Sequence, residues 1–233
     1  MLKLMTAAVV LLLGASQVLA GDPCGPGHMR TAKVQSGVLE LRWEGRLADQ
    51  MSGDIAAEYD RSKKYISAVS LSLHSCGGSL LYVQRVVSVL EQIKAAHELV
   101  TVVDRGATCA SACVPIFLAG KRRAAALTSA FYFHPVVMQL GDPGTDEAGE
   151  RMRVRAELTD DVLTRYFVSA GISEDWLQYL RRSLRTHDLW QSGRDLWESK
   201  SGIVTETIDN LEPREYGPVD LPTGTICGVK CRG

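Results

Sequence analysis

The sequence lacks an excess of either charge sign, and it has no long block of like charge. It contains 26 lysines and arginines against 27 aspartates and glutamates, which gives a formal net charge of -1. Proteins that bind nucleic acid carry a basic patch or stripe, so this balance argues against a nucleic-acid partner. We expect the two short arginine clusters, Arg122-Arg123 and Arg181-Arg182, to lie on solvated faces.

Three further signatures are missing from the sequence. It has no internal repeats, no low-complexity tract and no glycine-rich nucleotide loop of the Walker type. Beyond the N-terminus, no apolar stretch approaches the roughly 20 residues that are needed to span a bilayer. The sequence therefore predicts neither a nucleotide-driven machine nor a membrane-embedded chain.

The first 20 residues carry the marked apolar segment of the chain. A single basic residue, Lys3, precedes the apolar run 6–13, and Val-Leu-Ala follows at 18–20. This order is typical of a cleaved secretory signal, which predicts a periplasmic or secreted protein. An uncleaved anchor is the alternative. A lipid anchor is disfavoured because three residues separate Ala20 from Cys24.

The rest of the chain suits one α/β domain with a buried sheet better than two independent cores. We predict an N-terminal segment at 21–37, the domain itself at 38–210 and a C-terminal tail at 211–233. The tail is rich in proline and glycine and contains Cys227 and Cys231. It is expected to be an irregular appendage that a disulfide holds in place.

Six cysteines follow the signal, in a compartment where disulfides form and persist. They are Cys24, Cys76, Cys109, Cys113, Cys227 and Cys231. Their pairing does not follow from the sequence. Cysteines four residues apart on a helix lie within disulfide range. Two alternatives are open: a bond between Cys109 and Cys113, or a bond from either of them to Cys76. Metal binding is the alternative, although the close Cys or His pairs of a zinc site are absent, and no metal or cofactor is expected.

Hydrophobic periodicity predicts an alternation of strands and helices in the first half of the domain. Strands are expected at 38–43, 66–73 and 99–103, and helices at 48–64 and 79–98. The strand, helix, strand unit at 66–103 predicts a parallel pair of strands. Further along, a strand is expected at 130–133, followed by helices at 147–170 and 173–184.

Three unusual segments each follow a predicted strand. These are the glycine pair Gly77-Gly78, the small-residue run 109–113, and His134, which precedes a proline. Ligands of α/β sheets gather at the carboxyl ends of strands, so these segments mark a candidate site.

The parts of a serine nucleophile site can be assigned among these segments. Ser111 stands among small residues at a predicted helix start, where free N–H groups favour developing negative charge. His134 is the candidate general base, and the N–H groups of Gly78 and Ala112 are candidate donors to an oxyanion. Pro115 fits this arrangement because the first turn of a helix needs no N–H from it.

The order and spacing of these segments resemble the proteolytic subunit of the Clp protease and its predicted periplasmic relatives. The resemblance covers about 38–205. It rests on the glycine turn 75–78, the nucleophile turn 109–113, a Phe-Leu-Ala-Gly run followed by a basic residue at 117–121, and the His-Pro pair at 134–135. The sequence departs from the family at Cys76, where a proline is usual. The long stretch 145–170 looks like the family's handle helix.

The resemblance implies a fold and a set of site residues. The implied fold is the α/β spiral of ββα units of the Clp-protease and crotonase type, with a mostly parallel sheet flanked by helices. The implied catalytic residues are Ser111, His134 and Asp188, and the implied oxyanion-hole residues are Gly77, Gly78 and Ala112.

Asp188 is assigned because it precedes an aromatic position and the later Gly-Ile-Val turn at 202–204. His187 and Asp195 are alternatives for the third member of the triad, since both lie in the same loop region. A structural role for Asp188, as the N-cap of the following helix, is a further alternative.

The resemblance implies an exported serine peptidase that cleaves peptides or unfolded proteins. No ATPase partner is expected, because ATP is not supplied outside the cytosol, and the related assemblies imply a homo-oligomer. The alternative from another class is a non-catalytic binding or assembly protein on the same scaffold. Crotonase-type acyl chemistry is disfavoured because its coenzyme A thioester substrates are cytosolic. A Ser-Lys dyad with Lys121 is disfavoured because Lys121 lies in an expected solvated turn.

Overall fold

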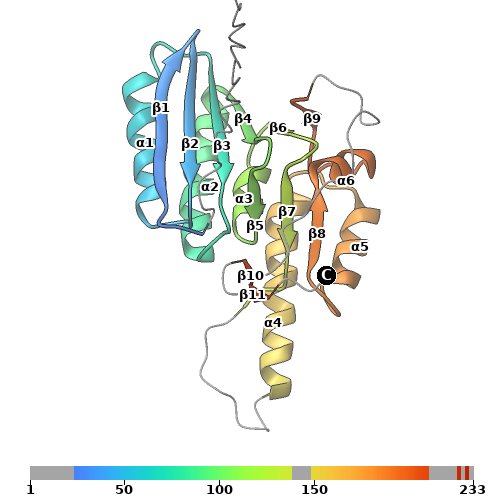
Figure 1. Ribbon diagram of the computed structural model, residues 1–233. Helices are drawn as coiled ribbons and strands as arrows, with labels where there is room; N and C mark the ends of the chain where they lie inside the picture. Colours follow the sequence, from blue (N-terminus) through green and yellow to red (C-terminus); the bar gives the residue numbers. More distant parts are fainter. Residues whose placement is uncertain (1–23, 138–147, 210–224, 227–228, 231–233) are drawn as a thin grey trace, which may run out of the picture.

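The computed structural model describes residues 24–137, 148–209, 225–226 and 229–230. The predicted signal at 1–20, Cys227, Cys231 and most of the predicted tail lie outside these residues. Within them, the α/β class with a mostly parallel sheet is confirmed (Figure 1). No helix in the described ranges is long and apolar enough to cross a membrane.

The main sheet has six strands in the order β1-β2-β3-β4-β6-β9. The strands are β1 (His28–Gln35), β2 (Val38–Glu44), β3 (Ala68–His74), β4 (Glu98–Val103), β6 (Arg122–Ala125) and β9 (Glu206–Thr207). All neighbouring pairs are parallel except β1 with β2. The parallel pair predicted for the unit 66–103 is therefore confirmed.

A second sheet has three strands in the order β5-β7-β8. These are β5 (Thr108–Ala110), β7 (Ala130–Phe133) and β8 (Leu189–Ser192). β5 is parallel to β7, whereas β7 and β8 are antiparallel. A single parallel bridge between Ser75 and Cys109 joins this sheet to the end of β3. The two sheets thus meet where the glycine turn and the nucleophile turn begin. A separate hairpin pairs β10 (Thr225–Ile226) with β11 (Val229–Lys230).

Helices α1 (Gln50–Ser62) and α2 (Leu80–Ala96) contact each other and the first strands of the main sheet. The helical spacing predicted for α2 is confirmed, because its apolar positions Val83, Val86, Leu90 and Ile93 are all buried. β2, β3 and β4 alternate between buried and half-buried residues, as expected for strands that bury one face. The burial of these apolar side chains drives the packing of the two layers.

The remaining helices surround the second sheet. They are α3 (Cys113–Leu118), α4 (Ala148–Val162), η2 (Leu163–Val168), α5 (Glu174–Ser183) and α6 (Gly193–Glu198). α4 projects from the body of the molecule (Figure 1). The sequence predicts one helix at 147–170, but the structure divides it, because the last part, η2, is a π-helix. A π-helical turn inserts a residue into the helical repeat and shifts the faces that the side chains occupy.

The main sheet begins before residue 38, the predicted start of the domain. β1 pairs with β2 along its length and belongs to the same sheet as the rest of the domain. The sequence does not signal this strand because β1 lies at the edge of the sheet, where most of its residues are exposed and polar.

The prediction that Arg122 and Arg123 both lie on a solvated face is wrong for Arg123. Arg123 is 7% exposed. Its guanidinium donates hydrogen bonds to four backbone carbonyls, at Gly120, Ala170, Gly202 and Ile203. Arg122 is exposed and pairs with Glu206. The two neighbours differ because β6 directs successive side chains to opposite faces of the sheet.

Candidate active site

The predicted nucleophile lies in a sharp turn between β5 and α3. Ser111 has a φ of 55°, a left-handed conformation that costs a non-glycine residue roughly 1–2 kcal/mol. Its N–H donates to the carbonyl of Tyr132 in β7 at 2.8 Å, and its own carbonyl accepts from Val114 N–H at 3.0 Å. The backbone on both sides of Ser111 is therefore held by neighbouring elements, and the expected position next to a helix start is confirmed.

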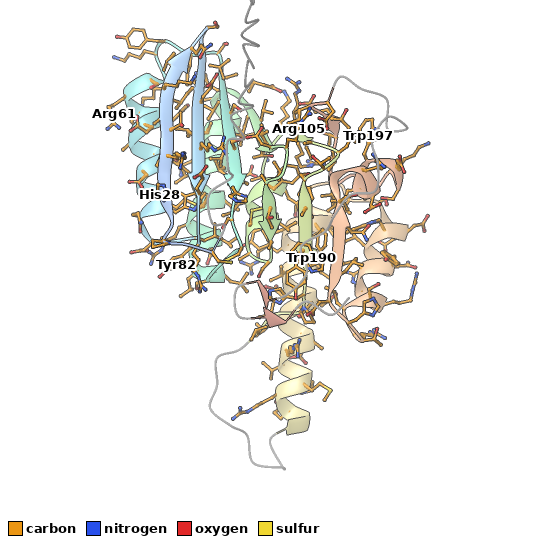
Figure 2. The ribbon with its side chains drawn as sticks, in the orientation of Figure 1. His28, Arg61, Tyr82, Arg105, Trp190 and Trp197 are labelled. Carbon is orange, nitrogen blue, oxygen red and sulfur yellow. A yellow bond between two sulfur atoms is a disulfide. The ribbon has the colours of Figure 1, made fainter. Side chains whose placement is uncertain are left out.

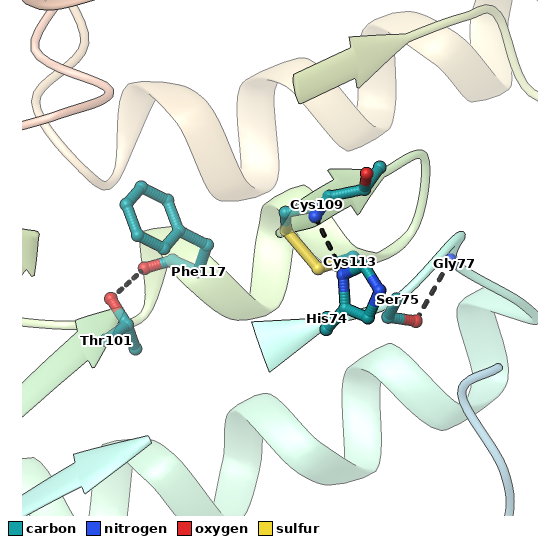
Figure 3. The surroundings of a disulfide bond; sticks show 8 residues. His74, Ser75, Gly77, Thr101, Cys109, Cys113 and Phe117 are labelled. Atoms are coloured by element: carbon teal, nitrogen blue, oxygen red, sulfur yellow. Dashed lines mark hydrogen bonds between the residues drawn. A yellow bond between two sulfur atoms is a disulfide. The ribbon is translucent and has the colours of Figure 1, made fainter. Parts of the chain in front are cut away.

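A disulfide closes this turn. Cys109 and Cys113 are bonded, with their Cα atoms 5.3 Å apart, and the bond encloses Ser111 (Figure 3). Of the pairings that the sequence left open, the structure has the bond between Cys109 and Cys113, which excludes a bond from either of them to Cys76. Cys76 is disulfide-bonded as well. The backbone carbonyl of Cys24 accepts from Arg46 Nε at 3.1 Å.

The end of β3 is anchored to the start of β5 by a buried histidine. The ring nitrogen Nδ1 of His74 accepts a hydrogen bond from the Thr108 N–H at 2.9 Å (Figure 3). Ser75 adds two backbone bonds, from its N–H to the Thr108 carbonyl and from the Ala110 N–H to its own carbonyl. These bonds set the glycine turn beside the nucleophile turn.

His134 follows β7 directly and reaches Ser111. Its Nε2 lies 2.7 Å from Ser111 Oγ, and its Nδ1 lies 2.6 Å from the carbonyl oxygen of Pro135. A carbonyl can only accept, so Nδ1 carries the proton and Nε2 is left to accept the hydroxyl proton of Ser111. This is the tautomer that a general base for the serine requires.

The pKa of His134 is lowered from its ordinary value, chiefly because burial disfavours the charged imidazolium. The hydrogen bond to Pro135 and the negative charge of Asp188 oppose this shift, whereas the positive charge of Arg155 adds to it. At neutral pH the imidazole is consequently neutral, and its Nε2 is available as a base.

Asp188 lies near His134 but does not accept a hydrogen bond from it. Its Oδ2 instead accepts from the phenol hydroxyl of Tyr132 at 2.7 Å. The two alternatives for the third member of the triad make other contacts. His187 is exposed and contacts Thr186, and Asp195 forms a capping box with Ser192 at the start of α6. That box also makes Ser192 the N-cap, which excludes this role for Asp188.

Gly77 allows the glycine turn to approach the nucleophile. Its φ is 93°, and a Cβ at this position would lie 2.7 Å from the Ala110 carbonyl and 2.8 Å from Ser111 Cβ. The Gly77 N–H donates to Ser75 Oγ at 3.1 Å. Within the described residues, the N–H groups of Gly78 and Ala112 have no hydrogen-bond partner. These two donors, rather than Gly77, are thus free to bind an oxyanion.

A cleft of about 650 Å³ opens beside Ser111 and His134. About half of its lining surface is apolar, and the apolar side chains come mainly from η2, α5, α3 and the segment after β7. The apolar side chains include Leu47, Leu80, Val114, Phe133, Val136, Val137, Val162, Leu163, Phe167, Leu180 and Leu184. Arg46, Ser79 and Thr159 add polar groups. Such a cleft accommodates an apolar side chain next to the serine.

Three site features were not anticipated from the sequence. The first is the hydrogen bond from Tyr132 to Asp188. The second is Thr159 on α4, which accepts from the Val136 N–H at 2.9 Å. The third is η2, from which Leu163 and Phe167 line the cleft. Tyr132 stands two residues before His134 in a strand, so the period of two places both on one face. That period is the signal that could have identified Tyr132.

The described residues contain no group of three or more His, Cys, Asp or Glu side chains that could hold a metal ion. The sequence comparisons identify no relative: no family model matches the chain, and no curated protein matches it. The chemistry of the site therefore rests on its own geometry.

Proposed function

We propose that the chain is an exported serine peptidase of the type of the Clp protease's proteolytic subunit, which acts without ATP on peptides or unfolded segments. The observation that carries this proposal is the 2.7 Å contact between Ser111 Oγ and His134 Nε2. It joins a nucleophile held in a left-handed turn to a neutral imidazole of the required tautomer. A serine that serves only structure needs neither feature.

The arrangement of elements supports the finer assignment to the Clp-protease and crotonase type of fold. The nucleophile turn follows a short strand of a second sheet, the base follows the neighbouring strand, and a long helix projects from the body (Figure 1). This order agrees with the order of motifs on which the resemblance rests.

The geometry supports an acyl-transfer mechanism. His134 Nε2 takes the hydroxyl proton as Ser111 Oγ attacks the peptide carbonyl, and the carbonyl oxygen becomes an oxyanion. The N–H groups of Gly78 and Ala112 stabilise that oxyanion. The C–N bond then breaks as His134 returns the proton to the leaving amine, and water hydrolyses the ester on Ser111 by the reverse sequence. Loss of one oxyanion donor costs about 10²–10³ in rate in such sites.

The cleft supports a preference for substrates with a large apolar side chain beside the scissile bond. Leu163, Phe167 and Leu180 line the same cleft as Ser111. Burial of an apolar side chain against such a surface is worth about 1.5–3 kcal/mol, which is ample to select among peptides.

The disulfide and the exposed apolar residues of α4 support the proposed localisation and the proposed homo-oligomer. The bond between Cys109 and Cys113 is suited to an oxidising compartment, as expected for a periplasmic or secreted protein. Met152 and Leu158 are exposed on the projecting α4, where a second copy of the chain could cover them in a homo-oligomer.

Reaction with a fluorophosphonate probe tests the proposal on the purified, oxidised chain. We expect the probe to label the wild type and to leave Ser111→Ala and His134→Ala unlabelled. Ser67→Ala is a matched control, because Ser67 is exposed at the opposite end of β3. Hydrolysis of unfolded casein or of peptides with a large apolar residue before the cleavage point should follow the same pattern.

Two outcomes would contradict the proposal. If the folded, oxidised wild type is neither labelled nor active on these substrates, the alternative of a non-catalytic binding or assembly protein takes its place. If Ser111→Ala is labelled as strongly as the wild type, another residue is the nucleophile.

A further inference from the structure

Tyr132 in β7 contacts both the ring of His134 and the carboxylate of Asp188, which directly precedes β8. It is 2% exposed, and its hydroxyl donates to Asp188 Oδ2 at 2.7 Å. Its ring lies 5.4 Å from the ring of His134 and 4.6 Å from that of Trp190, between centroids. Trp190 belongs to β8, beside β7 (Figure 2). A buried phenol hydroxyl must find an acceptor, and here that acceptor is the carboxylate nearest the base.

The pairing of β7 with β8 explains this arrangement. Tyr132 pairs with Trp190, and Phe133 pairs with Leu189. The next residues in this antiparallel register are His134 and Asp188, which therefore face each other across the two strand ends. Residues opposite each other in such a pair have Cβ atoms about 4.5–5.5 Å apart, within reach of a side-chain hydrogen bond.

The carboxylate has two oxygens, and Tyr132 occupies one of them. The charge of Asp188 acts on the imidazole of His134, whose Nδ1–H donates to the Pro135 carbonyl in this arrangement. A carboxylate without a fixed donor would turn toward solvent, because Asp188 is only half-buried. A hydrogen bond from a buried hydroxyl to a charged acceptor is among the stronger kinds.

We infer that Tyr132 is a positioning residue for the proposed catalytic site, whose hydroxyl holds Asp188 opposite His134 so that the carboxylate stabilises the imidazolium formed during acyl transfer. The catalytic consequence of this inference rests on the proposed function. The hydrogen bond from Tyr132 to Asp188 and the register of β7 with β8 are independent of that function. Tyr132 does not contact the reacting atoms and acts through Asp188.

A double-mutant cycle of Tyr132→Phe and Asp188→Asn tests this inference. Phenylalanine keeps the ring against Trp190 and removes only the hydroxyl. We expect Tyr132→Phe to lower kcat/KM roughly 10-fold with KM little changed, the size of one lost bond to a charged group. Asp188→Asn should lower it further, and the double variant should equal Asp188→Asn alone, since the hydroxyl then has no carboxylate to hold.

An NMR titration of the His134 imidazole tests the same inference without a measurement of enzymatic activity. Two charged groups act on the His134 imidazole: Asp188 favours the imidazolium, and Arg155 on α4 disfavours it. The ring of Tyr132 lies beside the imidazole. The pKa of His134 should therefore fall in Tyr132→Phe, in the same direction as in Asp188→Asn, and should fall no further in the double variant.

The results separate failure of the inference from failure of the proposed function. An inactive wild type in which the His134 pKa responds as described would overturn the peptidase and leave the positioning intact. An active wild type would overturn the inference if Tyr132→Phe matches it in rate and in His134 pKa. Losses that multiply in the double variant would also overturn it, because they indicate that Tyr132 acts independently of Asp188.

Discussion

At the scale of single residues, the environment of His134 determines the pH at which Ser111 can be activated. Burial favours the neutral imidazole, and Arg155 does the same, whereas Asp188 and the bond to Pro135 favour the imidazolium. Burial is the largest of these influences, so the net effect is a lowered pKa. The neutral form, which accepts the hydroxyl proton, is therefore populated to lower pH than in an exposed histidine.

We predict that the acid limb of the pH profile for kcat/KM, or for fluorophosphonate labelling, lies below 6.5, the ordinary value for histidine. Activity should rise with pH through this limb, because deprotonation produces the base. Arg155→Gln should move the limb to higher pH, since it removes a cation that disfavours the imidazolium. An acid limb clearly above 6.5 in the wild type would contradict this account of the site.

At the scale of elements, the turn between β5 and α3 combines an unfavourable backbone conformation with a covalent constraint. Ser111 has a positive φ, and the disulfide between Cys109 and Cys113 joins the strand before it to the helix after it. Backbone bonds to β7 and to the end of β3 support the same turn. The conformation of the nucleophile is thus determined by three elements rather than by the local sequence.

Replacement of both cysteines by alanine should loosen this turn. In the chain-entropy description, a loop of this length contributes about 2 kcal/mol, so we expect the free energy of unfolding to fall by about that amount in urea titrations. Labelling of Ser111 should also become slower. Circular dichroism of the variant at 25 °C checks that the fold persists, and a labelling rate equal to that of the wild type would show that the hydrogen bonds alone hold the turn.

At the scale of the whole molecule, Arg123 joins segments that are distant in the sequence. From β6 its guanidinium reaches the carbonyls of Ala170, after η2, and of Gly202 and Ile203, before β9. No carboxylate pairs with it among the described residues. Burial lowers the pKa of Arg123, but an arginine stays protonated in proteins, so a buried charge is satisfied here by carbonyl oxygens alone.

Arg123→Met should therefore destabilise the whole fold. It leaves several buried carbonyls without a donor, and we expect a loss of roughly 3 kcal/mol in the free energy of unfolding, measured by urea titration. Arg122→Gln is the matched control, because it removes only an exposed pair with Glu206 and should cost less than about 1 kcal/mol. Equal losses in the two variants would refute the joining role of Arg123.

Part of this organisation could be predicted from the sequence alone. The apolar periods of 66–103 placed β3, α2 and β4, whereas the bond between Cys109 and Cys113 was one of several pairings that the sequence allowed. Ser111 and His134 were selected because each follows a predicted strand, and parallel strands bring their carboxyl ends together. The predictions of β3, α2 and β4 succeeded because they depend on local periodicity.

Only the tertiary structure decided the remainder. The polar edge strand β1, the burial of Arg123 and the bond from Tyr132 to Asp188 each depend on a partner far away in the sequence. Local composition does not reveal such a partner, because water and a buried acceptor can each satisfy the hydrogen bonds of the same polar side chain. The sequence by itself determined the succession of elements from β2 to β4 and the types of reactive groups. The pairing of β7 with β8 and the contact between the two sheets decided which groups meet.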